Sequence, residues 1–130
     1  MGVKAGLGNE KKTILVAEDL GSINRLICAR LEKEGYQVIP AYDGSEALKA
    51  INEQPVDLAL LNMMMPYIDG SQVLKRIRAA GISIPVIIFS VKSHESFLKQ
   101  CLYYGANGYL VKPFQLDDMI TLANDLLRES

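Results

Sequence analysis

Residues 13–31 read TILVAEDLGSINRLICARL, and this stretch decides the fold class. Its first five residues form a continuous apolar run, which is typical of a strand in a parallel sheet that helices cover on both faces. Apolar residues then recur at helical spacing, at Ile23, Leu26, Ile27 and Leu31. This spacing predicts an amphipathic helix, so the stretch is predicted to be one β-strand followed by one α-helix.

The same unit recurs along the rest of the chain. Further short apolar runs alternate with helix-period stretches, at residues 36–41, 57–61, 85–89 and 108–111. A glycine follows several of the helical stretches, where the left-handed residue that ends a helix costs least, at Gly35, Gly81 and Gly105. The order is therefore βαβαβαβαβα, which predicts an α/β fold with a doubly wound, five-stranded parallel sheet.

Length and composition indicate one ordered domain and exclude several classes of protein. The chain has 130 residues, with residues 1–12 predicted to be a flexible leader, 13–130 the domain, and no output domain after the last helix. The 14 basic and 15 acidic residues give no basic excess for direct nucleic-acid binding. No apolar run is long enough to cross a membrane. The two cysteines, Cys28 and Cys101, are predicted to be buried free thiols, which favours a cytoplasmic location.

Polar side chains follow four of the predicted strands. They are Glu18-Asp19, Asn62, Ser90 and Lys112. The carboxyl ends of parallel strands meet at one edge of the sheet, so these side chains are expected to converge. Two adjacent carboxylates repel each other unless a cation neutralises them, and oxygen ligands with room for water suit Mg²⁺. A lysine and a hydroxyl beside such an ion suit the oxygens of a phosphoryl group.

Simpler structural roles compete with this interpretation. Glu18-Asp19 could form a solvated turn in which Asp19 or Ser22 caps the next helix. Asp69-Gly70 is predicted to be a turn in the loop before the third helix. His94, the only histidine, is expected to be exposed near the start of the fourth helix.

Longer motifs carry a resemblance to a known family. They are the acidic pair Glu18-Asp19, the run LLNMMMPYIDG at 60–70, PVIIFS at 85–90 and GANGYLVKPF at 105–114. In this order and spacing the chain resembles the receiver domain of two-component response regulators, from Ile14 to about Leu127. The resemblance implies a flavodoxin-like (βα)5 arrangement with strand order 2-1-3-4-5.

The resemblance also implies a role for each site residue. Asp19 would be a direct Mg²⁺ ligand, with Glu18 beside it, position 62 and the backbone carbonyl of Met64 completing the protein ligands. Ser90 and Lys112 would contact a phosphoryl group, and Tyr109 would turn inward or outward as Ser90 moves. The bond between Lys112 and Pro113 would be cis.

One departure from the family pattern is chemically large. The family has a phosphate-accepting Asp where this chain has Asn62, and an amide oxygen is a poor nucleophile. No phosphorylation at position 62 and weaker Mg²⁺ binding are therefore expected, and the domain is not expected to act as an enzyme. Two explanations stay open: a natural pseudo-receiver, or an engineered Asp-to-Asn form of a phosphorylatable receiver. Val91 is bulkier than the family's usual residue and could narrow access to the site.

The resemblance implies partners as well. They are a sensor histidine kinase or phosphotransfer protein, and a downstream target bound through the fourth helix, fifth strand and fifth helix. A homodimer would use the same face, and neither nucleic acid nor a membrane is expected as a direct partner. A small flavin-binding electron carrier of the same topology is an alternative, but Glu18 and Asp19 would repel the flavin phosphate in the loop that would have to hold it.

Overall fold

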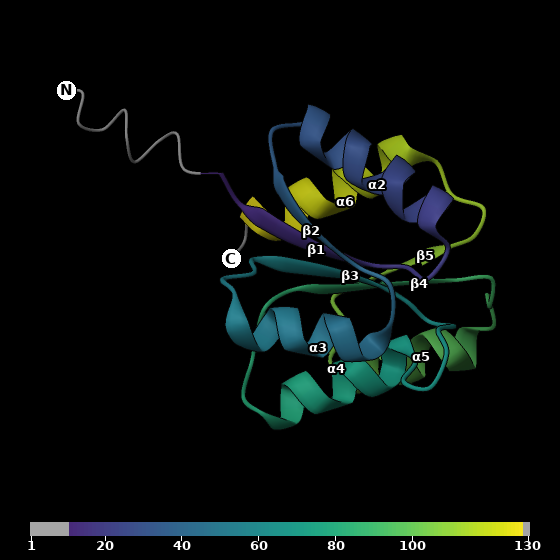
Figure 1. Cartoon of the computed structure of the whole chain (residues 1–130). Helices are drawn as coiled ribbons and strands as arrows, with labels where there is room; N and C mark the ends of the chain where they lie inside the picture. The colour runs from purple at the N-terminus through teal and green to yellow at the C-terminus, as the bar shows by residue number, and fades with distance from the viewer. Residues whose placement is uncertain (1–10, 129–130) are drawn as a thin grey trace.

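A central parallel sheet lies between two layers of helices in the computed structural model, which describes residues 11–128 (Figure 1). In chain order the elements are β1 (Thr13–Ala17), α2 (Gly21–Lys33), β2 (Gln37–Ala41), α3 (Gly44–Glu53), β3 (Leu58–Asn62), α4 (Gly70–Ala79), β4 (Val86–Ser90), α5 (Glu95–Tyr103), β5 (Gly108–Val111) and α6 (Leu116–Arg128). The strand order is β2-β1-β3-β4-β5 and every pairing is parallel, which confirms the predicted fold. The predicted leader lies outside the described residues except for 11 and 12.

Each face of the sheet has its own apolar core. Helices α3, α4 and α5 pack on one face, and α2 and α6 pack on the other. The central strands β1, β3 and β4 are buried almost throughout, whereas the edge strands β2 and β5 are partly exposed. Pro40 lies in β2, where an edge position tolerates a residue without an N–H group. No helix in the part of the chain that the structure describes is long and apolar enough to span a membrane.

Strands β3 and β4 end in Asn62 and Ser90, as predicted, one residue beyond the apolar runs. Asn62 pairs with Phe89, and Ser90 pairs with Val111, so both polar residues belong to the sheet ladder. The predicted runs ended at the last apolar side chain, but backbone pairing continues for as long as a neighbouring strand offers partners. Asn62 and Ser90 are consequently held by strand geometry rather than by a loop.

The buried stripe of α2 differs from the predicted one. Its buried residues are Asn24, Ile27, Cys28 and Leu31, whereas the predicted members Ile23 and Leu26 are exposed and line an apolar groove with the β5–α6 loop. The prediction assigned only apolar side chains to the buried face of the helix, and it therefore missed Asn24.

Helix starts provide two further corrections. The residue before α2 is Leu20, and neither Asp19 nor Ser22 caps this helix. Asp69-Gly70 is not a loop turn, because Asp69 caps α4 in a capping box with Gln72. The predicted left-handed conformations at Gly35, Gly81 and Gly105 are confirmed.

Close backbone approach requires glycine where α3 and α4 begin. A Cβ atom on Gly44 would lie 2.3 Å from the carbonyl oxygen of Ile68, and one on Gly70 would lie 2.5 Å from that of Asn62. Both contacts involve backbone, which cannot move aside as the end of a side chain can. The two glycines thus hold the β3–α4 loop, residues 63–69, against both helices.

Substituting Gly44→Ala should therefore destabilise the domain by about 1–3 kcal/mol through overpacking. Gly21→Ala is the matched control, since Gly21 also begins a helix but a Cβ atom there would meet only the end of the Arg25 side chain, at 3.1 Å. This control should change the free energy of unfolding by less than about 1 kcal/mol. Urea unfolding of the two variants and the native protein makes the comparison, and equal stabilities would contradict the packing argument.

Both cysteines are free and buried, as predicted. Burial raises the pKa of the Cys28 thiol to about 11, and it also raises that of Cys101. At pH 8 only about one Cys28 in a thousand would be a thiolate, the reactive form. Iodoacetamide at pH 8 should thus leave the folded protein unmodified for hours and label two thiols once urea is added. Rapid labelling of the folded protein would show that these helices open readily.

Candidate functional site

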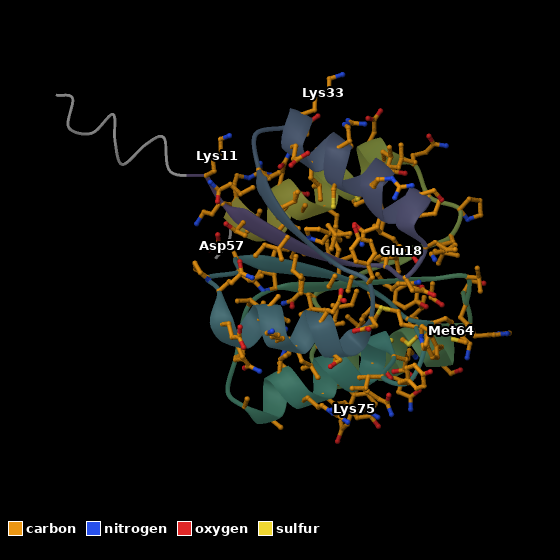
Figure 2. All side chains as sticks on the ribbon, viewed as in Figure 1. Lys11, Glu18, Lys33, Asp57, Met64 and Lys75 are labelled. Atoms are coloured by element: carbon orange, nitrogen blue, oxygen red, sulfur yellow. The ribbon has the colours of Figure 1, made fainter. Side chains whose placement is uncertain are left out.

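The carboxyl edge of the sheet brings together the polar residues that the sequence analysis singled out. Glu18 follows β1, Asn62 ends β3, Ser90 ends β4 and Lys112 follows β5. Glu18 and Met64 lie at this end of the sheet, opposite Lys11 and Asp57 (Figure 2). Glu18 has no exposed surface, and Asn62 and Ser90 are buried as well.

The side-chain amide of Asn62 lies at the centre of this cluster. Its Nδ2 atom donates to Glu18 Oε2 at 3.1 Å and to the backbone oxygen of Met64 at 3.1 Å, with Asp19 Oδ1 at 3.4 Å. The amide therefore connects the turn after β1 with the loop after β3. All four positions predicted to hold a metal meet around this nitrogen.

Glu18 receives partners at both carboxylate oxygens. Lys112 Nζ forms an ion pair with Oε1 at 3.4 Å, and Oε2 accepts from the backbone N–H of Leu20 at 3.1 Å as well as from Asn62. The peptide bond from Lys112 to Pro113 is cis, as predicted. A buried carboxylate is tolerated when its charge is paired and its oxygens are hydrogen-bonded, and Glu18 meets both conditions.

Ser90 and Tyr109 both contact the loop between β4 and α5. The backbone N–H of Lys92 donates to Ser90 Oγ at 3.1 Å, and the Tyr109 hydroxyl donates to the Lys92 carbonyl at 3.0 Å. The Tyr109 ring packs edge-to-face on Phe97, and burial raises the pKa of its hydroxyl. Ser90 and Tyr109 thus both bind the backbone of Lys92. The predicted switch role stays a prediction.

Asn24 is a site-supporting residue that the sequence analysis missed. It has no exposed surface, and its Nδ2 atom contacts three carbonyl oxygens, those of Val16, Glu18 and Ala41, at 3.0–3.2 Å. Its Oδ1 atom accepts from the Cys28 thiol. Asn24 thus ties α2 to the ends of β1 and β2 and fixes the backbone that carries Glu18. Its spacing of three, four and seven residues from Ile27, Cys28 and Leu31 was the available signal.

Comparisons with known proteins agree with this arrangement. A family model described as the response regulator receiver domain matches residues 14–124. The chain belongs to this family. Its receiver fold has a close counterpart in the receiver domain of Francisella response regulator 1452, with a TM-score of 0.89, 36% identity, and coverage of 92% of this chain and 98% of that one.

Two curated relatives are longer than this chain. The receiver domain is 44% identical over 103 residues to response regulator GtcR of Aneurinibacillus migulanus, covering 79% of this chain and 42% of GtcR. It is 37% identical over 119 residues to the alkaline phosphatase synthesis transcriptional regulatory protein PhoP of Bacillus subtilis (strain 168), covering 92% of this chain and 50% of PhoP. The chain thus spans about half the length of these relatives or less.

Receiver domains generally bind Mg²⁺ at their acidic site, so the donor set can be tested against that ion. Mg²⁺ needs oxygen ligands at about 2.0–2.1 Å in octahedral geometry. Here the oxygens of Glu18, Asp19 and Met64 surround an N–H donor, which cannot ligate a cation. Within residues 11–128 no group of three or more His, Cys, Asp or Glu side chains could hold a metal ion. As arranged, the site does not fit Mg²⁺.

Substituting Asn24→Ala should lower the free energy of unfolding by about 2–3 kcal/mol, because three buried carbonyls lose a donor. The matched control is Asn52→Ala on the exposed surface of α3, which should change stability by less than about 0.5 kcal/mol. Urea unfolding monitored by circular dichroism measures both. If Asn24→Ala were as stable as the control, Asn24 would not hold the site backbone.

Proposed function

We propose that this receiver domain is a conformational switch and protein-interaction module in two-component signalling that is not phosphorylated at position 62. In this account Asn62 stands at the position where the family carries its phosphoacceptor Asp. The observation that carries the proposal is the direction of the Asn62 amide, whose Nδ2 atom donates to Glu18 and Met64. An amide is neutral, so its oxygen lacks the negative charge that makes a carboxylate an attacking group.

The hydrogen bonds of the Asn62 amide also affect how well the site can bind Mg²⁺. An ion would find the carboxylates of Glu18 and Asp19, with the former already paired to Lys112, and the carbonyl of Met64. Position 62 would supply a further ligand only if the amide turned to present its oxygen. We therefore expect reduced affinity for Mg²⁺. Without the ion and the nucleophile, the self-phosphorylation and dephosphorylation chemistry of the family would be lost, and the domain would not be an enzyme.

Three other site residues support the alternative that this chain derives from a phosphorylatable receiver. Ser90, Lys112 and Glu18 lie at the strand ends that the family's phosphoryl chemistry would use. A chain carrying Asp at position 62, whether as an ancestor or as the protein from which this one was engineered, would be a Mg²⁺-dependent, phosphorylatable receiver. The flavin-carrier alternative has no support from the site, because Glu18 and Asp19 occupy the loop after β1.

We further propose the partners of a cytoplasmic signalling domain. They are a sensor histidine kinase or phosphotransfer protein, and a downstream protein that contacts the face formed by α5, β5 and α6, which is also where a homodimer would form. Exposed apolar side chains on this face, Leu102, Tyr103 and Val111, support such contacts. The relatives named transcriptional regulators are about twice as long, so direct DNA binding is not proposed for this domain.

The test compares the native protein with Asn62→Asp after incubation with acetyl phosphate and Mg²⁺. Intact-protein mass should show a phosphoryl group on Asn62→Asp and none on the native protein, because only the carboxylate can attack phosphorus. Asn62→Ala is the control, because its side chain at position 62 has neither a carboxylate nor an amide.

A phosphoryl mass on the native protein at position 62 would overturn the proposal. If Asn62→Asp also stays unmodified, the site differs from a phosphorylatable receiver beyond position 62. That result would remove the engineered alternative and leave a phosphate-independent interaction module.

A further inference from the structure

We propose that the Asn62 amide takes the place of a divalent cation, so that the acidic edge of this domain is closed without metal. This inference rests on the proposed function and deepens it. If the Asn62 side chain joins the acidic residues itself, the arrangement of the site would be the same with and without Mg²⁺. The ion would then not regulate this domain.

Three oxygens lie around Nδ2, as oxygens would around a cation, but at hydrogen-bond distances. Glu18 Oε2 and the Met64 carbonyl lie 3.1 Å away, and Asp19 Oδ1 lies 3.4 Å away. These oxygens belong to two separate segments, the turn after β1 and the loop after β3. A bound cation would join the same two segments, and here the amide hydrogens do so.

The buried charge in the cluster is paired without an ion. Glu18 is fully buried, and its charge is paired with Lys112 while Asn62 and Leu20 donate to its other oxygen. Asp19 is exposed, so water solvates its charge. A carboxylate at position 62 would put three negative charges beside one lysine, and like charges at this distance strongly favour binding of a cation or a proton.

Entry of a metal would also break contacts. The amide would have to turn so that Oδ1 faced the ion, which would remove the hydrogen bonds from Nδ2 to Glu18 and Met64. The turned amino group would then need new acceptors in a site that is already buried. A cation therefore competes with the amide for the same oxygens.

Thermal unfolding in EDTA and in 10 mM MgCl₂, without any phosphate donor, tests this inference. Mg²⁺ should raise the unfolding midpoint of the native protein by less than about 1 °C, and that of Asn62→Asp by about 5 °C. Asn62→Ala removes the amide without adding charge, and its midpoint should rise by about 2 °C because the vacated oxygens become available. Asn52→Asp, the same chemical change on the exposed surface of α3, should behave as the native protein does.

A native midpoint that rises as much as that of Asn62→Asp would overturn the inference. The inference would also be overturned if Mg²⁺ raised the midpoint of Asn62→Asp but not that of Asn62→Ala. The added negative charge, rather than the loss of the amide, would then explain Mg²⁺ binding. If Asn62→Asp does not fold, the response of Asn62→Ala decides between the two outcomes. The unfolding midpoint does not depend on phosphorylation, so this inference and the proposed function can fail separately. Mg²⁺ could stabilise a native protein that is never phosphorylated, which would overturn only this inference. A native protein that is phosphorylated but not stabilised by Mg²⁺ would overturn only the proposed function.

Discussion

A carboxylate without exposed surface must have a partner for its charge and for each oxygen, and the carboxyl edge of this sheet is built around that requirement at Glu18. Lys112 neutralises one oxygen from the end of β5, and Asn62 and the Leu20 backbone donate to the other. These contacts connect the ends of β1, β3 and β5. Asn62 and Lys112 reach the buried Glu18 carboxylate because they lie at the ends of β3 and β5.

Residues elsewhere in the sequence hold the backbone around this edge. Asn24 holds the backbone of Glu18 from inside α2, and Gly44 and Gly70 let α3 and α4 begin in direct contact with the loop after β3. These contacts position the backbone segments that carry Glu18 and Asn62.

The sequence predicted the fold well because parallel strands buried on both faces leave continuous apolar runs. It also placed Glu18, Asn62, Ser90 and Lys112 at one edge, since strand order and strand ends suffice for that. It was wrong about the buried face of α2, where Asn24 is inside and Leu26 outside, because apolar periodicity does not reveal a polar residue that satisfies carbonyls. The direction of the Asn62 amide could not be predicted, since it depends on donors and acceptors brought together by folding.

In the proposed arrangement the Asn62 amide, rather than a metal, closes the acidic site. The most direct measurement is the pair of side-chain NH₂ signals of Asn62 in a ¹H–¹⁵N correlation spectrum, recorded before and after addition of Mg²⁺ and assigned with Asn62→Ala. We expect two distinct signals that exchange slowly with water and do not move when Mg²⁺ is added, because both N–H groups donate to oxygens of the site. Signals that exchange rapidly, or that shift as Mg²⁺ is added, would contradict this arrangement.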